Sequence, residues 1–257
     1  MTQPLSVAFN AEQTRAAFTL FHPKGNILTA DMVGALRSAL EEAAENPHLK
    51  LITIEGAGSD FSYGASIPEH APDQIGTVLP AMHALIYELL DAPAPTAALA
   101  RGRCLGGGFE LALACDFIMA EEGATFGLPE IALGVFPPAA SAILPLRVGH
   151  AAATQAILTG EAIDAATWRT KGLVELVARP GELAAAVDAW FSRFMAPRSA
   201  AALRHAALAA RIGLTAHVRD TLPALERLYL DELMRTHDAI EGIDAFMARR
   251  RPAWTDR

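Results

Sequence analysis

The sequence predicts an α/β fold in which helices pack on parallel strands. Short apolar runs rich in β-prone residues alternate with segments whose apolar residues recur at helical spacing. One strand-like run, residues 95–100, leads through the consecutive glycines Gly106, Gly107 and Gly108 directly into an Ala- and Leu-rich helical segment. This alternating order is typical of α/β proteins, although spacing alone does not say which of their folds is present.

The first half of the chain is predicted to hold three strands and two helices. Thr29 is suited to cap the first helix, which Pro47 ends, because a threonine hydroxyl accepts from free amides of the first turn. The predicted elements are a strand over 18–21, a turn over 22–26, a helix over 30–46, a buried strand over 49–55, loops over 56–66, a helix over 78–90 and a strand over 95–100.

The second half is predicted to be richer in helices. After a helix over 109–114, the expected elements are a strand over 117–120, irregular segments over 125–130 and 133–138, helices over 140–148, 150–160 and 164–171, a strand over 173–178 and a helix over 183–195. Residues 199–251 have an almost wholly helical pattern. We therefore divide the chain into a core over 1–195 and a helical C-terminal region over 196–257.

The composition predicts a folded protein that does not bind nucleic acid. Of the 257 residues 52% are hydrophobic and 19% are charged, which excludes disorder as the main state. The net charge of −8 disfavours a nucleic-acid surface, because such surfaces are normally basic. The eight histidines are scattered without the spacing of metal ligands, so no metal site is expected.

The cysteine content, the N-terminal residues and the length of the apolar runs favour a cytoplasmic location. Cys104 and Cys115 are the only cysteines and do not form a disulfide framework, which favours a reducing compartment. Residues 1–10 lack the basic start and apolar run of a signal peptide. No uninterrupted apolar run reaches the roughly 18 residues that a membrane span needs.

The glycine run has a chemical interpretation as well as a structural one. Glycines at a strand-to-helix junction leave unpaired amides at the positive end of a helix dipole. Such amides bind a phosphate, a carboxylate or a carbonyl oxygen that gains negative charge. The alternative is that the glycines only allow the helix to pack tightly on its strand.

Four sequence blocks identify a family resemblance over nearly the whole chain. They are 61–66 (FSYGAS), 105–112 (LGGGFELA), 124–134 (ATFGLPEIALG), and 158–161 (LTGE) with 171–174 (KGLV). In this order they resemble the crotonase (enoyl-CoA hydratase/isomerase) superfamily. The resemblance implies a spiral of ββα turns followed by a C-terminal helical region that drives trimerisation, often into dimers of trimers. It also implies an acyl-CoA substrate, with coenzyme A as part of that substrate and no separate cofactor.

The resemblance also implies a catalytic site. Ala65 and Gly107 match the two positions whose backbone amides form an oxyanion hole, and Glu110 and Glu130 match the two catalytic glutamates of hydratases. Small residues suit the first role because they leave room for the thioester, and two carboxyl groups can divide the proton transfers of hydration. We assign Glu130 as the acid that exchanges the carbon proton and Glu110 as the group that orients and activates water. The alternatives are that Glu110 only interacts favourably with the helix dipole and that Glu130 is a solvated loop residue.

Two departures from the family pattern suggest which acyl group is bound. Ser66 stands where many members have Asp, and residues 136–141 (FPPAAS) stand where many have a glycine-rich run. These features resemble family members that hydrate a cyclic dienoyl thioester in anaerobic aromatic degradation. Flat walls from Tyr63 and Phe136 would suit a six-membered ring, although both rings can instead pack in the core. The full set of predicted substrate-binding residues is Tyr63, Gly64, Ser66, Ile67, Gly106 and Phe136.

Three further side chains near these blocks have alternative interpretations, and the sequence leaves other functions open. His70 is interpreted as a surface loop residue rather than a group near the substrate, and Arg101 and Arg103 either reach the phosphates of coenzyme A or form structural ion pairs. Other possible functions are a general short-chain enoyl-CoA hydratase, an enoyl-CoA isomerase or a ring-chain hydrolase of a related thioester, an RNA-binding relative and an inactive assembly subunit. The apolar stripe that includes Leu222 and Leu233 is interpreted as a core or subunit-packing surface.

Overall fold

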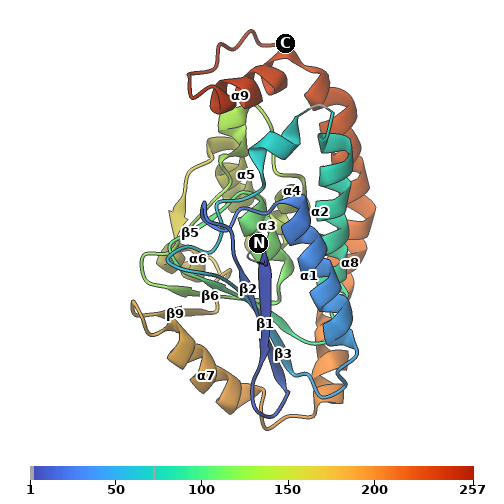
Figure 1. Ribbon diagram of the computed structural model, residues 1–257, viewed down its shortest axis with the longest axis vertical. Coiled ribbons are helices and arrows are strands. Elements are labelled where there is room, and N and C mark those ends of the chain that lie inside the picture. The colour runs from blue at the N-terminus through green and yellow to red at the C-terminus, as the bar shows by residue number, and fades with distance from the viewer. Residues whose placement is uncertain (1–2, 72) are drawn as a thin grey trace.

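A twisted six-stranded sheet runs through the centre of the molecule (Figure 1). The computed structural model describes residues 3–71 and 73–257, so Met1 and Thr2 of the segment tested for a signal peptide lie outside the described residues. The strand order is β1-β2-β3-β4-β6-β9, with β1 and β2 antiparallel and every other pair parallel. The strands are β1 (Leu5–Phe9), β2 (Arg15–Leu20), β3 (Leu51–Gly56), β4 (Thr96–Ala100), β6 (Phe117–Glu121) and β9 (Leu176–Ala178).

Helices cover both faces of this sheet because alternate strand residues point to opposite sides. Ile52 and Ile54 of β3 belong to the main core, which also contains buried residues of α1 (Ala30–Ala44) and α2 (Ile75–Leu90). Leu51 of the same strand faces the other way and packs in a cluster with Trp190 of α7 (Leu183–Phe194). The predicted α/β class with helices on parallel strands is therefore confirmed.

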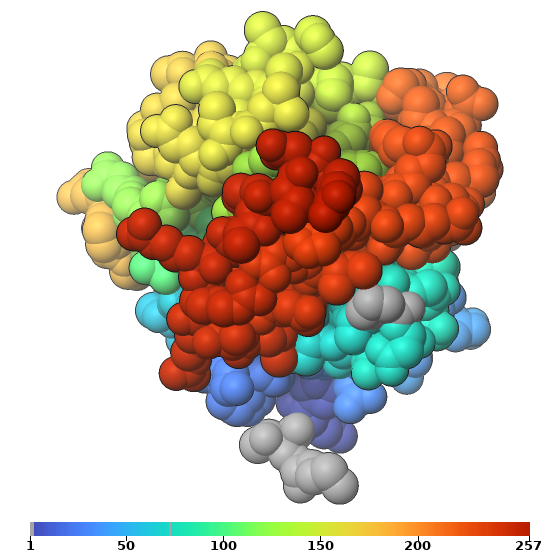
Figure 2. All heavy atoms as spheres, turned by 90° about the horizontal axis from the view of Figure 1, so that it is seen from above, coloured from blue at the N-terminus to red at the C-terminus, as the bar shows by residue number. Residues whose placement is uncertain are grey.

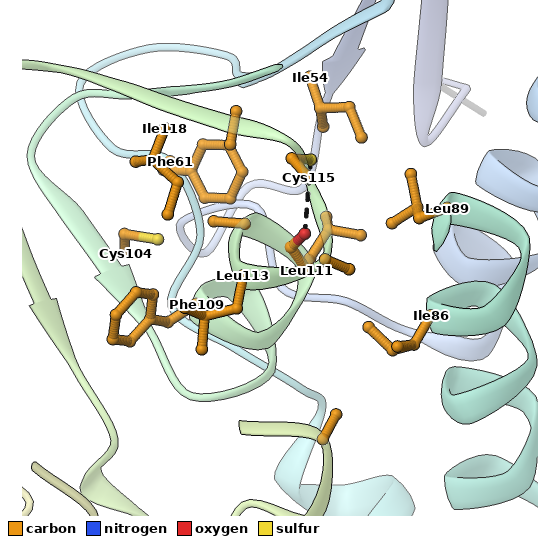
Figure 3. Close-up of a cluster of buried hydrophobic side chains, with 14 of the residues drawn as sticks. Ile54, Phe61, Ile86, Leu89, Cys104, Phe109, Leu111, Leu113, Cys115 and Ile118 are labelled. Atoms are coloured by element: carbon orange, nitrogen blue, oxygen red, sulfur yellow. Dashed lines mark hydrogen bonds between the residues drawn. The ribbon is translucent and has the colours of Figure 1, made fainter. Parts of the chain in front are cut away.

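A short helix, α3 (Gly107–Ala114), lies at the centre of the main core. All eight of its residues are buried, and Figure 3 shows Phe109, Leu111 and Leu113 among side chains from the surrounding strands and from α2. At its C-terminal end the half-buried Arg147 donates hydrogen bonds of 2.8 Å to the carbonyl oxygens of Leu113 and Cys115. These bonds satisfy helix carbonyls that otherwise lack a partner, and they hold α3 in place.

A second, three-stranded sheet lies beside α3. It consists of β5 (Arg103–Leu105), β7 (Thr125–Gly127) and β8 (Ile163–Asp164) in the order β5-β7-β8. The pair β5 and β7 is parallel, and β7 and β8 are antiparallel. The helices that follow in the chain are α4 (Pro138–Val148), α5 (His150–Thr159) and α6 (Ala165–Thr170).

The C-terminal region is one long helix followed by shorter turns. Helix α8 (Ala200–Arg227) lies along α2, as Figure 1 shows, and also contacts α4. It leads into a π-helical turn (Leu228–Glu232), a 3₁₀ turn (Leu233–Arg235) and α9 (His237–Met247). Figure 2 shows this last segment spread across one end of the molecule. In the described residues, no helix combines the length and the apolar character that crossing a membrane requires.

Most elements agree with the sequence prediction, and the differences have simple causes. Helix α2 begins at Ile75 rather than at residue 78, and α4 begins at Pro138 rather than at 140 because proline suits a first helical turn. The strand expected over 173–178 is restricted to β9, Leu176–Ala178. Strand β1 is an addition to the prediction; only Leu5 of its five residues is buried, so it is an exposed edge strand of the sheet. Residues 125–127 were expected to be irregular but form β7.

Candidate active site

The two predicted catalytic glutamates are brought together by the parallel strands β5 and β7. Leu105 pairs with Gly127, so both strands end at the same edge of the small sheet. Beyond that edge the first strand leads into α3, whose first turn carries Glu110, and the second leads into a 3₁₀ turn (Pro129–Leu133) that carries Glu130. Loops that follow parallel strands at one edge of a sheet are a common place for a binding site.

The backbone amides of Ala65 and Gly107 lie side by side. The segment before Ala65 runs parallel to β5, because Leu105 N–H donates to the Ser62 carbonyl at 2.9 Å. A Cβ atom built on Gly107 would lie 3.2 Å from the Ala65 nitrogen. In the described part of the chain neither amide has a protein acceptor, since the hydrogen bonds around Ala65 use Gly64 and Ser66 and Gly107 is the first residue of its helix. Two adjacent free donors are the arrangement that an oxyanion hole requires.

Two glycines allow this close approach through backbone conformations that other residues rarely adopt. Gly64 has φ of +100°, and a Cβ atom there would lie 2.9 Å from the Leu105 carbonyl oxygen. Gly106 has φ of +51°, and a Cβ atom there would lie 2.7 Å from Oε1 of Glu130. The missing side chains thus let the two loops meet and let the Glu130 carboxyl group reach the edge of the glycine run.

Glu110 is buried and held by the helix that faces it. Its Oε1 accepts a 2.9 Å hydrogen bond from the Ala140 amide at the start of α4. Burial raises the pKa of Glu110 from 4.5 to about 7, and the hydrogen bonds from the Ala140 and Ala139 amides limit this rise. The carboxyl group is therefore fixed in orientation and can gain or lose a proton close to neutral pH.

Glu130 has a different environment at the same site. Its Oε2 is buried and has no hydrogen-bond partner among the described residues. Burial, together with the charge of Glu110, raises the pKa of Glu130 to about 8. An unpaired buried carboxyl oxygen beside a second carboxyl group favours the protonated form, which can act as an acid.

Both glutamates line a cleft of about 750 Å³ that is open to solvent. The structure brings nine of the ten predicted site residues together in this cleft. They are Tyr63, Gly64, Ala65, Ile67, Gly106, Gly107, Glu110, Glu130 and Phe136. The lining is otherwise mostly apolar, as is usual for a site that binds a small molecule.

Ser66 is the predicted residue that does not line the cleft. Its amide donates to the Leu28 carbonyl at 3.1 Å and its carbonyl oxygen lies 2.9 Å from Nδ1 of His70. Successive residues of an extended segment face opposite ways, so Ala65 presents its amide to the cleft while Ser66 is turned into the protein. Its place in the family motif therefore does not make its side chain a contact of the cleft.

His70 was interpreted as a surface residue, and the structure corrects this. Its ring lines the cleft, and burial lowers the pKa of His70. Arg101 forms an ion pair of 2.8 Å with Glu55, which agrees with its structural interpretation. The guanidinium carbon of Arg103 lies 5.4 Å from the centre of the Tyr63 ring, and Tyr63 is 41% exposed at the rim of the cleft.

Sequence reasoning did not single out the residues that the C-terminal region contributes. Tyr229 of the π-helical turn and Ile243 of α9 line the cleft together with Leu79 and Met82 of α2. The Tyr229 ring packs edge-on against Phe136, with ring centres 5.5 Å apart. Tyr229 lies within a long helical pattern that carries no motif, so only the fold reveals its position.

Comparisons with known proteins identify the family of this chain. The sequence profile of the enoyl-CoA hydratase/isomerase family matches residues 10–257. Cyclohexa-1,5-dienecarbonyl-CoA hydratase from Thauera aromatica is 42% identical over 256 residues, which cover 100% of this chain and 98% of the relative. A 2,3-dehydroadipyl-CoA hydratase from Escherichia coli is 34% identical and aligns with 96% of this chain and 97% of its own length.

Solved structures of enoyl-CoA hydratases share the fold of this chain. An enoyl-CoA hydratase from Mycobacterium avium subsp. paratuberculosis superposes with a TM-score of 0.87 at 31% identity, covering 98% of this chain and 99% of that protein. The family resemblance of the four sequence blocks is thereby confirmed, together with the crotonase fold that it implies. The chain belongs to the enoyl-CoA hydratase/isomerase family of enzymes.

Proposed function

We propose that this protein adds water to the double bond of an α,β-unsaturated acyl-CoA thioester. One observation carries the proposal: a single cleft contains two carboxyl groups with raised pKa values and two adjacent backbone amides without a described protein acceptor. An isomerase needs a carboxyl group that moves one proton between carbons. Hydration needs one proton removed from water and another delivered to carbon, which suits two carboxyl groups.

The two amides act on the thioester carbonyl. When water adds to the β-carbon, negative charge develops on the carbonyl oxygen, and the Ala65 and Gly107 amides donate to that oxygen. Because Gly107 is the first residue of α3, the positive end of the helix dipole points to the same place. Loss of one such donor typically lowers the rate by about 10²–10³-fold.

The two glutamates divide the proton transfers. In this proposal the Glu110 carboxylate accepts a proton from water as the oxygen bonds to the β-carbon, and protonated Glu130 delivers its proton to the carbon that takes up hydrogen. This assignment follows the hydrogen bonds: the Ala140 amide donates to Glu110, which favours its carboxylate, whereas Oε2 of Glu130 has no partner among the described residues. The pKa values of both groups are raised, to about 7 for Glu110 and about 8 for Glu130. Near neutral pH the pair then carries one proton, the state from which the reaction begins.

The acyl group that fits best is a ring. Phe136 and the two prolines that follow it give one side of the cleft a rigid apolar wall, since each proline fixes its own φ. The relative from Thauera aromatica is named for cyclohexa-1,5-dienecarbonyl-CoA, which is a six-membered cyclic diene. We therefore propose that this protein converts that thioester to 6-hydroxycyclohex-1-ene-1-carbonyl-CoA. Coenzyme A enters as part of the substrate, and the proposed reaction needs no other cofactor.

The test compares two thioesters with the same purified protein. Crotonyl-CoA and cyclohexa-1,5-diene-1-carbonyl-CoA are each incubated with it, and the products are followed by mass for the gain of one water. The proposal expects hydration with a strong preference for the cyclic diene. A preference for crotonyl-CoA would reject the cyclic substrate and leave a general hydratase. Rearrangement of a 3-enoyl-CoA by Glu110→Gln at an undiminished rate, without gain of water by the wild type, would indicate an isomerase.

The proposed assembly is a trimer, or a dimer of trimers, formed through the C-terminal region. Helix α8 carries exposed apolar side chains, among them Leu208 at 40% and Ile212 at 70% exposure. Large apolar side chains gathered on one helix face are often buried between subunits. Light scattering after gel filtration tests this assembly, and Ile212→Glu should shift the measured mass toward the monomer. A wild-type protein that elutes with the mass of one chain would reject it.

A further inference from the structure

The most informative unassigned side chain in the cleft is Tyr229. It lies on the π-helical turn Leu228–Glu232, which interrupts the helical path between α8 and α9. A π turn changes which side of a helix its residues face, and such turns occur frequently at functional sites. Here Tyr229 is 2% exposed, lines the same cleft as the two glutamates and packs against Phe136.

The hydroxyl group of Tyr229 can donate a hydrogen bond, and no described residue accepts one from it. Tyr229 forms no side-chain hydrogen bond with a described residue, and its oxygen is not among the fully buried side-chain atoms that lack a partner, so it keeps some accessible surface. The residue itself lines the cleft. Buried tyrosine hydroxyls usually have a partner. Burial and the charges of Glu130 and Glu110 raise the pKa of Tyr229, which keeps the phenol neutral and able to donate.

Its neighbours indicate what it donates to. The other groups of the cleft near this wall, such as Leu79, Val135 and Ile243, are apolar. A bound water that hydrates the substrate donates its two hydrogens to the two carboxyl groups and uses one lone pair to attack the β-carbon. Its second lone pair can accept a hydrogen bond from one further donor, and the neutral hydroxyl group of Tyr229 is a donor that lines this cleft.

We propose that Tyr229 is a third polar residue of the reaction site, whose hydroxyl group donates a hydrogen bond to the oxygen that is added to the β-carbon. This inference rests on the proposed hydration. It assigns the C-terminal region a direct part in recognising the hydroxyl group of the product, in addition to closing the cleft.

Binding of two inert ligands tests the role without turnover. 3-Hydroxypivaloyl-CoA carries a hydroxyl group on its β-carbon and has no α-hydrogen, so it cannot lose water; pivaloyl-CoA lacks only that hydroxyl group. Tyr229→Phe keeps the ring that packs on Phe136. We expect this variant to bind the hydroxylated ligand about tenfold more weakly, and pivaloyl-CoA with unchanged affinity, because one hydrogen bond is lost.

The control is Tyr87→Phe, which removes a phenol from α2 outside the cleft and should change neither affinity. Equal weakening of both ligands by Tyr229→Phe, or no weakening of either, would overturn the proposal, because the ring would then serve only as a wall. The hydration assay is a separate measurement. Failure of the wild type to hydrate either thioester would reject the proposed function, whereas normal hydration with an unchanged ligand ratio would reject the role of Tyr229 alone.

Discussion

The Ala140 amide donates a 2.9 Å hydrogen bond to Oε1 of Glu110. This contact joins the first turn of α3 to the first turn of α4, and it exists because residues 139 and 140 follow the proline pair at the start of α4. Oε2 of Glu130 has no such partner among the described residues. Of the two carboxyl groups in the cleft, Glu110 therefore accepts a hydrogen bond from a backbone amide while Oε2 of Glu130 accepts none. This difference is the physical basis for assigning them different roles.

Activity should depend on pH as a bell-shaped curve. Hydration as proposed needs one of the two carboxyl groups ionised and the other protonated. Since the pKa values are raised to about 7 and about 8, kcat/KM should fall below the lower value, where both are protonated, and above the higher value, where both are ionised. Initial rates across pH 5–10 test this, and a flat profile through pH 6–9 would contradict it.

Removing the Glu110 carboxyl group should lower the pKa of Glu130. The charge of Glu110 is one of the causes that raise the pKa of Glu130, so Glu110→Gln should lower the pKa of Glu130. Its titration can be followed by NMR with ¹³C-labelled glutamate. The same variant should lose hydration by about 10²–10⁴-fold, the usual contribution of one acid–base group. An unchanged Glu130 titration would show that the two carboxyl groups do not interact.

The stability of the fold should also depend on Glu130. Its pKa is raised above the ordinary value of 4.5, so the folded protein binds this proton more tightly than the unfolded chain does. The stability contributed by the protonated form is present below pH 4.5 and is lost as the pH rises through about 8.

Glu130→Gln is neutral at every pH and should avoid that loss. Its melting temperature should exceed that of the wild type by about 3 °C or more at pH 8.5, and the difference should narrow toward pH 5. Glu161→Gln, which changes an exposed carboxyl group, is the control and should show no such pH-dependent difference. A difference that is the same at both pH values would contradict the assignment.

The predicted parts of the site are those whose geometry is local. Glu110 follows the glycine run by two residues and Glu130 lies within the block 124–134, so each sits in a contiguous motif that sequence can identify. Ser66 shows the limit of this reasoning, because it belongs to the same motif but faces away from the cleft. In extended chain a shift of one residue reverses the direction of a side chain, and the motif does not report that direction.

The parts that sequence missed depend on contacts between distant segments. Tyr229 lines the cleft of the two glutamates only because α8 lies along α2 and α4 and because a π turn follows it. Strands β5 and β7 have three residues each, which is too short for alternation to be visible. Their pairing is nevertheless what places Glu110 beside Glu130, so the central relationship of the site is tertiary.

Arg211 should be necessary for stability although it lies outside the cleft. Its guanidinium group is 4% exposed, pairs with Asp116 at 2.5 Å and donates to the carbonyl oxygens of Ala92 and Ala94 at 2.7 and 2.9 Å. Arg211→Ala removes the buried cation that pairs with Asp116 and leaves that carboxylate with its Thr96 donors alone. It also removes the donors to the Ala92 and Ala94 carbonyls, so the free energy of unfolding should fall by about 3–5 kcal/mol. Urea unfolding measures it, with the exposed Arg179→Ala as control. A loss below about 1 kcal/mol would contradict this reasoning.

Gly107→Ala should separate activity from stability. The φ of Gly107 is not in the left-handed region, so alanine adds no backbone strain there and improves helix propensity. The new Cβ atom, however, would lie 3.2 Å from the Ala65 nitrogen, between the two amides that are proposed to bind the thioester oxygen. We therefore expect kcat to fall by about 10²–10³-fold, the cost of losing one oxyanion donor.

The matched control for this change is Gly34→Ala on α1. A Cβ atom at Gly34 meets nothing within 4 Å, so the same substitution should leave kcat unchanged and keep or slightly raise the melting temperature. Steady-state kinetics and thermal unfolding of both variants decide the matter. If Gly107→Ala retains full activity, the amides of Ala65 and Gly107 do not bind the oxygen that gains charge, because no carbonyl group can reach both donors past the added methyl group. If kcat and the melting temperature fall together, the added methyl group has disturbed α3 itself. The position of the Ala65 amide in a structure with bound ligand then decides whether it donates to the thioester oxygen.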